Sequence, residues 1–573
     1  MLAYYRIPAD CAVLRPAPAH AQAKKAQPPG KESTGPGRQA AAGGMTPAGP
    51  SGLSRLSHAS PVTMALPRGL YHEDGITMIE ERAVPRPGRA AAARQALAVS
   101  AGKAARSGIR WLGQGNGSAA PGAVALAIDP GALAGLADRI PLGSVLVTGS
   151  NGKGTTCRML AQVMHAAGLH PITNHEGSNQ LAGVTTALLA GTGPASQPAS
   201  GPQAAGAAAI GLLEVDEGSS PVVFPQIARP AAVVVTNLFR DQLDRYLEPD
   251  YVRSLLEGAL RSLPPETTLV LNADDPRLAH LAPELPNPRL YFGVADTAHG
   301  RPGADPTSDS PRCPRCDGEL DYSCVLYAHL GHWSCAGCGL ARPAPDVEVT
   351  KIDLLGPGSS RLQITTPGTE TILDVPLPGL YNAYNALAAV AAATAGELPG
   401  PAIAAIERVT AGCLRMERIA VPGHDIYLAM AKNANGYTEV LRALAGDGQP
   451  RWLVLGLNDC AGKQPDLSWI WDVDFDALRG QVPAAVTTGN RAADVAVRLK
   501  YAGWLGGAVP TDLATEPDPV QALQHLLAQV PDGQPVWVIS TSIALARMRS
   551  WLHKLGYAGE LWEDTEGTSG WQS

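Results

Sequence analysis

The sequence has no excess of positive charge and no long apolar run, and both absences exclude classes of protein. Its 573 residues carry 45 Lys and Arg against 52 Asp and Glu, which gives a formal net charge of −7. A general nucleic-acid binder is usually basic, so that class is not expected. No apolar run reaches the roughly 18 residues that span a bilayer, and no basic flank followed by an apolar core marks the N-terminus. We expect a cytoplasmic enzyme of about two to four domains that does not cross the membrane.

Cysteine is sparse, which argues against a framework of disulfides. The chain has nine cysteines, and five of them are scattered: Cys11, Cys157, Cys324, Cys413 and Cys460. The other four form two Cys-x-x-Cys pairs with 18 residues between them: Cys313, Cys316, Cys335 and Cys338. Four thiolates at this spacing are typical of tetrahedral Zn²⁺ in a ribbon. We predict a closed structural zinc site. Three residues between the pairs are weaker candidates as ligands: Cys324, His329 and His332. A redox or iron role for the cluster also remains as an alternative.

Residues 1–88 lack any sustained apolar periodicity. Ala, Pro, Gly and Ser dominate the stretch, so it cannot bury enough apolar surface to offset the entropy of ordering the chain. We expect a disordered extension. A translation start placed too far upstream is an equal alternative, with Met64 or Met78 as the true first residue.

The rest of the chain alternates short apolar runs with helical stretches, which favours α/β domains with mostly parallel sheets. Helices are expected at 89–110 and 381–395. Strands are expected at 144–147, 210–213, 232–235, 268–271, 452–455, 484–487 and 536–539. We therefore predict a central ATP-binding domain, an insertion that carries the cysteine pairs, and a C-terminal Rossmann-like α/β domain. Their predicted ranges are 89–415, 312–343 and 416–573.

The clearest chemistry lies where an apolar strand feeds a glycine-rich turn and a helix begins. The turn and first helical residues are Gly149, Asn151, Gly152, Lys153, Gly154, Thr155 and Thr156. Glycines let backbone N–H groups close around phosphate oxygens, and the helix N-terminus adds a favourable dipole. Lys153 can reach the β- and γ-phosphates, and Thr155 or Thr156 can hold Mg²⁺. The spacing is not the full Walker A pattern, because Val147 occupies the place of the first glycine. We predict nucleotide binding.

Several segments, in the same order along the chain, resemble the Mur ligase family, which includes the folylpolyglutamate synthases. They are residues 148–156, 177–179, 183–186, 272–276 and 379–385, together with Glu214 and Arg415. The resemblance covers about residues 89–573 and implies the Mur ligase fold.

The resemblance also implies roles for single residues. Glu214, a hard oxygen ligand, would bind Mg²⁺, and Arg415 would neutralise phosphate charge in the transition state. Asn179, Asn382 and Asn385 match residues near the adenine and ribose. The alternatives are a structural salt bridge for Glu214, helix capping for the asparagines and a plain surface position for Arg415.

Residues 237–246 point to one branch of the family. Mur ligases that join amino acids usually have a metal-binding histidine where this chain has Gln242. They also use a carbamylated lysine downstream, but no lysine lies between Lys153 and Lys351. The segment instead resembles MurT-type subunits of lipid II isoglutaminyl synthase, as do residues 466–475. The sequence departs from the usual pattern of that type at two places. Ala434 stands where proline is usual, and the loop 460–465 differs.

That resemblance implies a reaction and a partner. ATP would convert the α-carboxyl of D-glutamate in the lipid II stem peptide to an acyl phosphate, and ammonia would give D-isoglutamine. A GatD-like class I glutamine amidotransferase would supply the ammonia, since this chain shows no Cys/His arrangement of its own. Catalysis is expected from Lys153 and Arg415, with ATP, Mg²⁺ and structural Zn²⁺ as cofactors, in the cytoplasm or at the inner face of the membrane.

Asp466 is the predicted contribution to the partner's site. An aspartate of the ligase subunit would orient the histidine of the partner's Cys/His pair; Asp472 and Asp459 are the next candidates. Trp469 and Trp471 would anchor the interface. The alternative is that both tryptophans belong to the core and Asp466 caps a helix.

Two other functions stay open from the sequence. One is a folylpolyglutamate-synthase-like amino-acid ligase, against which Gln242 and the missing lysine argue. The other is a non-catalytic ATP- and zinc-binding scaffold, against which the joint presence of Lys153, Thr155, Glu214 and Arg415 argues.

Overall fold

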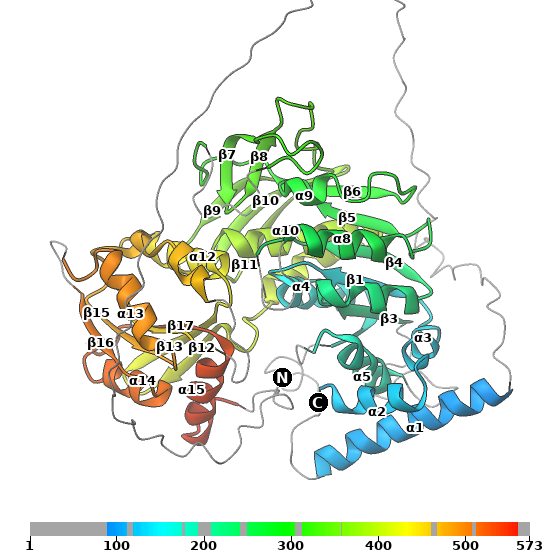
Figure 1. Ribbon diagram of the computed structural model, residues 1–573, viewed down its shortest axis with the longest axis horizontal. Coiled ribbons are helices and arrows are strands. Elements are labelled where there is room, and N and C mark those ends of the chain that lie inside the picture. The colour runs from blue at the N-terminus through cyan, green and yellow to red at the C-terminus, as the bar shows by residue number, and fades with distance from the viewer. Residues whose placement is uncertain are drawn as a thin grey trace, which may run out of the picture. The chain divides into compact units, whose positions relative to one another are not determined.

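The computed structural model describes most of the chain from Arg89 onward (Figure 1). The described residues are 89–111, 118–174, 178–192, 208–240, 249–303, 312–356, 358–459, 467–506 and 511–559. All of them fall in one compact unit, Gly69–Ser573. The predicted extension 1–88, Gln242 and Asp466 lie outside the described residues.

A nine-stranded sheet forms the larger part of this unit. Its strand order is β11-β10-β9-β6-β5-β4-β1-β3-β2. The bounds are β1 Ser144–Thr148, β2 Leu169–Thr173, β3 Ala208–Glu214, β4 Pro230–Val235, β5 Thr268–Asn272, β6 Arg289–Val294, β9 Val347–Leu354, β10 Ser360–Thr366 and β11 Thr369–Val375. Strands β1 to β6 pair in parallel and β9 joins β6 in parallel, whereas β10 and β11 are antiparallel. The expected parallel sheet is confirmed.

Helices cover both faces of this sheet, because successive strand residues point to opposite faces. Val145 and Val147 of β1 enter the core under α4 (Lys153–Ala166) and α10 (Leu380–Ala395), while Leu146 enters the opposite core. That second core lies under α3 (Ala132–Ala137), α5 (Leu181–Gly191) and α8 (Pro249–Leu260).

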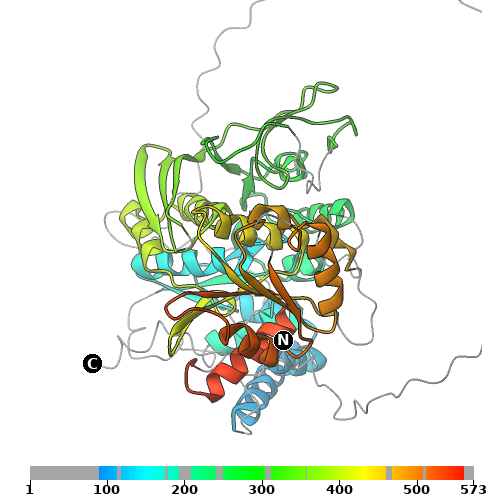
Figure 2. The same ribbon diagram turned by 90° about the vertical axis from the view of Figure 1, so that its left-hand side faces the viewer.

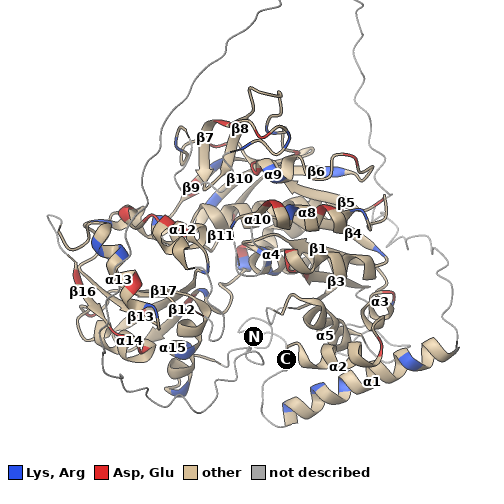
Figure 3. Ribbon diagram, viewed as in Figure 1, with Lys and Arg blue, Asp and Glu red and all other residues tan. Residues whose placement is uncertain are grey.

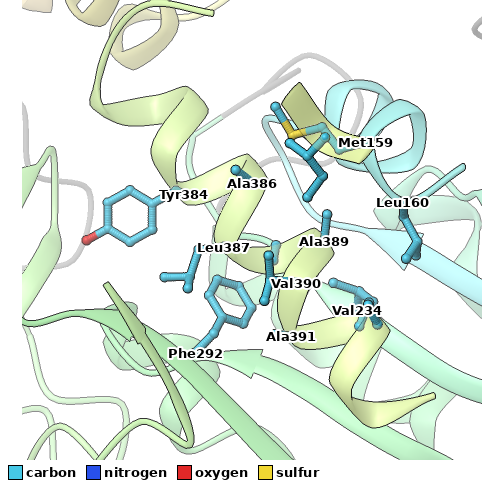
Figure 4. Close-up of a cluster of buried hydrophobic side chains, with 14 of the residues drawn as sticks. Met159, Leu160, Val234, Phe292, Tyr384, Ala386, Leu387, Ala389, Val390 and Ala391 are labelled. Carbon is cyan, nitrogen blue, oxygen red and sulfur yellow. The ribbon is translucent and has the colours of Figure 1, made fainter. Parts of the chain in front are cut away.

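Helix α10 is buried along almost its whole length. Alanines make up much of it, and they pack beside Met159 of α4 and Val234 and Phe292 of the sheet (Figure 4). A helix that is apolar on every side needs neighbours on every side. The small side chains let α10 approach α4 and the strands closely.

In the described part of the chain, α1 (Arg89–Trp111) and α2 (Ala120–Ile128) come before α3 and the first strand of the sheet. Helix α1 carries five basic residues and no acidic one (Figure 3). It packs on α2, where Gly122 N donates to Thr186 Oγ1 of α5 at 2.9 Å. Among the described residues, no helix combines the length and apolar character that crossing a bilayer requires.

Between the two cysteine pairs lies a hairpin, drawn green in Figure 2, of β7 (Asp321–Tyr327) and β8 (Leu330–Ser334). A second, six-stranded sheet has the order β12-β13-β17-β14-β15-β16 and is parallel except for β12. Its bounds are β12 Arg415–Val421, β13 His424–Met430, β14 Trp452–Gly456, β15 Ala484–Thr488, β16 Asp512–Thr515 and β17 Val536–Ser540. This matches the predicted C-terminal α/β segment and its three strands.

The remaining helices are short or flank the second sheet. Those packed with the second sheet are α12 Ala434–Ala445, α13 Ala492–Tyr501, α14 Pro519–Leu527 and α15 Ser542–Lys554. Short α-helices are α6 Ser220–Val223, α9 Pro276–Ala279 and α11 Gly400–Ile403. The 3-10 turns are η2 Glu217–Ser219, η3 Phe224–Gln226, η4 Ala404–Arg408, η5 Ser468–Asp472 and η6 Phe475–Leu478.

Candidate nucleotide site

The phosphate loop joins the end of β1 to the start of α4, as the sequence predicted. Gly149 and Gly152 have φ values of +123° and +86°, a region that favours glycine. A Cβ on Gly149 would lie 2.4 Å from Thr236 Oγ1, and one on Gly152 would lie 2.0 Å from Asn385 Oδ1. Only glycine fits this backbone, and the loop lies at the carboxyl ends of the parallel strands, where α/β sheets bind ligands.

The end of β4 holds the loop from outside. Asn151 N donates to Asn237 Oδ1 at 2.8 Å, and Thr236 Oγ1 donates to Asn151 O at 2.7 Å. The Asn151 side chain faces Asn433, the N-cap of α12, whose Nδ2 donates to Asn151 Oδ1 at 3.1 Å. Sequence reasoning did not single out these partners.

Lys153 is buried and paired with an acid that the sequence analysis missed. Its Nζ lies 2.9 Å from Glu217 Oε2, and it also donates to the carbonyl oxygens of Gly149 and Ser150. Burial lowers the pKa of Lys153, but the charges of Glu217, Glu214 and Asp216 outweigh it, so the pKa is raised. Lys153 is therefore held as a cation beside the loop. The sequence signal that could have found it is a second acid, Glu217, three residues after Glu214 at the end of β3.

Glu214 lies at the end of β3 and faces the first turn of α4. A Cβ on Gly154 would lie 3.0 Å from Glu214 Oε2, so the glycine leaves room beside the carboxylate. Glu214 Oε1 accepts a hydrogen bond from Asn179 Nδ2 at 2.9 Å. The strand end is fixed because Asn174 bonds both the N–H and the carbonyl of Glu214, at 2.8 and 2.7 Å.

The asparagines of α10 reach the same place. Asn385 lies against Gly152, its Nδ2 donates to Asn382 Oδ1 at 3.1 Å, and its carbonyl accepts from Thr156 Oγ1 at 3.4 Å. The capping alternative does not apply here. Gly379 is the N-cap of α10 and Gln180 that of α5, and neither helix has a side-chain cap bond.

Arg415 stands apart from the loop. It is exposed at the start of β12, and its charge acts on Tyr381, the neighbour of Asn382. Within the described residues, no hydrogen bond or ion pair joins it to the phosphate loop. Its predicted role stays a prediction.

The residues expected to meet a partner are only partly described. Asp472 is exposed and pairs with Arg240 at 3.2 Å, whereas Asp459 Oδ2 lies 3.6 Å from Arg491. Trp469 is half-buried against Tyr437, with ring centroids 6.3 Å apart. Trp471 is 50% exposed. The two tryptophans therefore differ, and only Trp471 offers a large surface.

The four paired cysteines gather into one cluster. All four sulfur atoms lie within 4.8 Å of one another: Cys313, Cys316, Cys335 and Cys338. The Sγ atoms of Cys313 and Cys338 are 3.6 Å apart, and those of Cys316 and Cys335 are 3.5 Å apart. The cluster could hold a metal ion. His329, a weaker ligand candidate, lies elsewhere, beside Asp275.

Comparison with known proteins agrees with this geometry. The family described as Mur ligase middle domain matches residues 147–305, and the one described as MurT ligase C-terminal matches residues 430–545. A pseudomurein peptide ligase type C from Methanothermus fervidus has a similar fold, with a TM-score of 0.55, 19% identity, and coverage of 73% of this chain and 79% of that one. MurF from Acinetobacter baumannii gives a TM-score of 0.53 at 18% identity, covering 75% and 80%.

Two curated relatives are more similar in sequence. The MurT subunit of lipid II isoglutaminyl synthase (glutamine-hydrolyzing) from Streptococcus pneumoniae is 31% identical over 460 residues, which is 80% of this chain and 96% of that protein. The MurT subunit from Staphylococcus aureus is 31% identical over 411 residues, or 71% and 88%. The fold is thus that of the Mur ligases. Within that class, the chain belongs to the MurT family.

Proposed function

We propose that this chain is the ligase subunit of an enzyme that amidates the D-glutamate α-carboxyl of the lipid II stem peptide. One observation carries the proposal. The phosphate loop, Lys153 and Glu214 lie together at the carboxyl ends of the parallel strands. Membership in the MurT family selects the reaction. A non-catalytic ATP- and zinc-binding scaffold would not need a buried lysine cation beside the carboxylates of Glu217 and Glu214.

The residues fit ATP and Mg²⁺. Gly149, Gly152 and Gly154 leave the space that a Cβ would fill, and the N-terminus of α4 favours phosphate. Glu214 would hold Mg²⁺, together with Thr155 or Thr156, and Asn179 would keep its carboxylate oriented. Asn382 and Asn385 are proposed to lie on the nucleoside side.

The reaction balances as two displacements. A carboxylate oxygen of D-glutamate attacks the γ-phosphorus, ADP leaves, and an acyl phosphate results. Ammonia then attacks the carbonyl carbon, phosphate leaves, and the nitrogen loses a proton. Lys153 offsets the charge that develops on the transferred phosphoryl group, and Arg415 is proposed to do so once substrates are bound.

The cysteine cluster is proposed to be a zinc ribbon inserted in the central domain. Tetrahedral Zn–S bonds of about 2.3 Å place sulfurs roughly 3.8 Å apart, close to the pair distances of 3.5 and 3.6 Å. Elemental analysis of the unaltered chain should give one zinc per chain. Cys335→Ser should abolish this zinc, while Cys413→Ala should retain it. Equal zinc in both variants would reject the site.

The ammonia is proposed to come from a GatD-like class I glutamine amidotransferase that contacts residues 416–573. Both curated relatives are named as subunits of a glutamine-hydrolyzing enzyme. Asp466 is the proposed residue that orients the histidine of the partner's Cys/His pair, with Asp472 and Asp459 next. The lipid-linked substrate would be met at the cytoplasmic face of the membrane.

The complex with its glutaminase subunit provides the test. With lipid II, ATP should be consumed and isoglutamine formed, from either glutamine or ammonium salts. Asp466→Asn should remove turnover with glutamine and leave turnover with ammonia. Asp472→Asn and Asp459→Asn are the comparison variants. No ATP consumption with lipid II and ammonia would reject the function, and equal loss with both nitrogen sources would reject only the role of Asp466.

A further inference from the structure

The β7–β8 hairpin buries its turn. Tyr327 pairs with Leu330, which leaves Ala328 and His329 as a two-residue connection. Such turns usually lie at the surface and favour Asn-Gly. Here Ala328 is 1% exposed and His329 is 0% exposed, and Ala328 has a φ of +50°. A residue other than glycine persists in this region where its surroundings hold it, so the contacts at the turn must be firm.

One route leads from His329 to the phosphate loop. His329 Nε2 lies 3.2 Å from Asp275 Oδ2, and that oxygen accepts a hydrogen bond from Leu238 N at 2.9 Å. The next residue, Phe239, is bonded to Ser150 twice. Its N–H donates to Ser150 Oγ at 2.9 Å, and that hydroxyl donates to the Phe239 carbonyl at 3.1 Å. A shift of His329 would therefore move the segment that holds Ser150.

A second route runs through Tyr327. Its ring centroid lies 5.0 Å from that of Phe239, whose ring is also 4.8 Å from His329. The Tyr327 hydroxyl lies 3.5 Å from Asn151 Nδ2. Tyr327 and Phe239 are both buried, so neither ring can move without displacing its neighbours.

The rest of the hairpin is anchored where β5 ends. Gly331 N donates to Asp274 O at 3.0 Å, and Trp333 Nε1 donates to Ala273 O at 3.2 Å. Beyond β8, Arg342 Nε lies 2.5 Å from Asp274 Oδ1. The hairpin is thus fixed to the sheet and can hold its turn in place.

We propose that the hairpin turn positions the phosphate loop, with Tyr327 and His329 as positioning residues that set the affinity for the nucleotide. The inference rests on the proposed function, since it takes the loop to bind ATP. Neither residue needs to touch the nucleotide, because Ser150 and Asn151 carry the effect.

Binding of MgADP to the full complex tests this inference, with Tyr327→Phe and His329→Gln as the variants. Tyr327→Phe removes the hydroxyl that faces Asn151. His329→Gln removes the imidazole ring that packs against Phe239, while its amide still offers a donor to Asp275. Each variant should weaken binding about threefold to tenfold. Matched controls are Tyr291→Phe and His299→Gln, whose side chains bond Ala279 O and Ile352 O away from the loop. The controls should bind as the unaltered complex does. Hydrogen exchange in residues 149–154 should quicken in the two variants alone.

The outcomes separate the two proposals. If the unaltered complex does not bind MgADP, the proposed function fails. If it binds, but Tyr327→Phe and His329→Gln bind equally well, the hairpin only supports the fold and the inference is overturned. A lower melting temperature of the two variants with unchanged MgADP affinity would also overturn the inference. Should His329→Gln not fold, Tyr327→Phe decides alone.

Discussion

At the scale of single residues, Lys153 is held by Glu217 in a buried ion pair. Removing one member of such a pair leaves the other charge buried and uncompensated. Lys153→Ala should therefore lower the free energy of unfolding by about 3–5 kcal/mol and reduce ATP-dependent turnover about 100-fold to 1000-fold. Urea unfolding and steady-state kinetics measure the two effects.

A double variant distinguishes folding from catalysis at this pair. Lys153→Ala with Glu217→Gln should regain part of the stability, because the Glu217 charge is gone while Glu214 and Asp216 still lose the Lys153 cation, but it should regain none of the turnover. Lys351→Ala, at an exposed lysine paired with Asp353, should change neither property. Recovery of turnover in the double variant would contradict the role of Lys153.

Asp275 predicts a dependence of stability on pH. Burial raises its pKa, but His329 and Arg277 and the hydrogen bond from Leu238 N together lower it below the ordinary 3.8. A lowered pKa in the folded state stabilises above the unfolded-state value, and that contribution is lost as the pH falls. Asp275→Asn should cost about 1.5–3 kcal/mol near pH 7, and the difference in urea midpoints should shrink below pH 3.8. Asp532→Asn, at an exposed position, is the control and should leave the urea midpoint near pH 7 unchanged.

The sequence brought some of the residues beside the loop to notice, but it missed Glu217 and did not show how the residues are paired. The glycine pattern and the resemblance brought together Lys153, Glu214 and Asn385, because the motif fixes their places at strand and helix ends. Glu217 and the pairing of His329 with Asp275 depend on how a turn and an inserted hairpin pack in three dimensions. Local sequence does not encode that packing.

At the scale of elements, Gly122 sets how closely α2 approaches α5. A Cβ there would lie 1.9 Å from Ala182 O and 2.9 Å from Thr186 N. Gly122→Ala should destabilise by about 1–3 kcal/mol, since the backbones must separate. Gly108→Ala on α1 meets nothing within 4 Å and should stabilise by about 0.5–1 kcal/mol through helix propensity. Thermal unfolding of the two variants should shift in opposite directions.

Strands were predicted well where they are buried on both faces. Continuous apolar runs such as those of β1, β4 and β17 indicate central parallel strands. No strand was predicted for residues 347–375, where β9 to β11 lie. Strand β9 joins β6 in parallel, and β10 and β11 add an antiparallel edge. Their alternating polar side chains face solvent on one side, as in Arg361 and Asp374 of the pair β10–β11.

At the scale of the whole molecule, Trp471 is the proposed anchor of the surface that meets the glutaminase subunit. It is 50% exposed, its ring centroid is 5.8 Å from that of Tyr501, and Arg498 lies 5.9 Å from its centre. Exposed aromatic side chains of this kind often dominate interfaces. Trp471→Ala should weaken binding of the glutaminase subunit by about 2 kcal/mol, or roughly 30-fold, with little change in melting temperature.

Tyr557→Ala is the matched control for that measurement, because Tyr557 is 40% exposed in the same part of the chain. It should bind the subunit normally in a pull-down or titration. Equal affinity of the Trp471 variant and the unaltered chain would place the interface elsewhere. The apolar runs predicted strands of both large sheets, whereas Asp466 lies outside the described residues and its role stays a prediction.

The alanines of α10 have a consequence for how this protein can vary. They place α10 directly against α4, and Asn385 of the same helix touches Gly152. A single added methylene on the buried side of α10 would push α4 outward and carry the phosphate loop with it. Replacing one of these buried alanines by valine would therefore act on the nucleotide site from a distance, although the substituted side chain does not touch the phosphate loop.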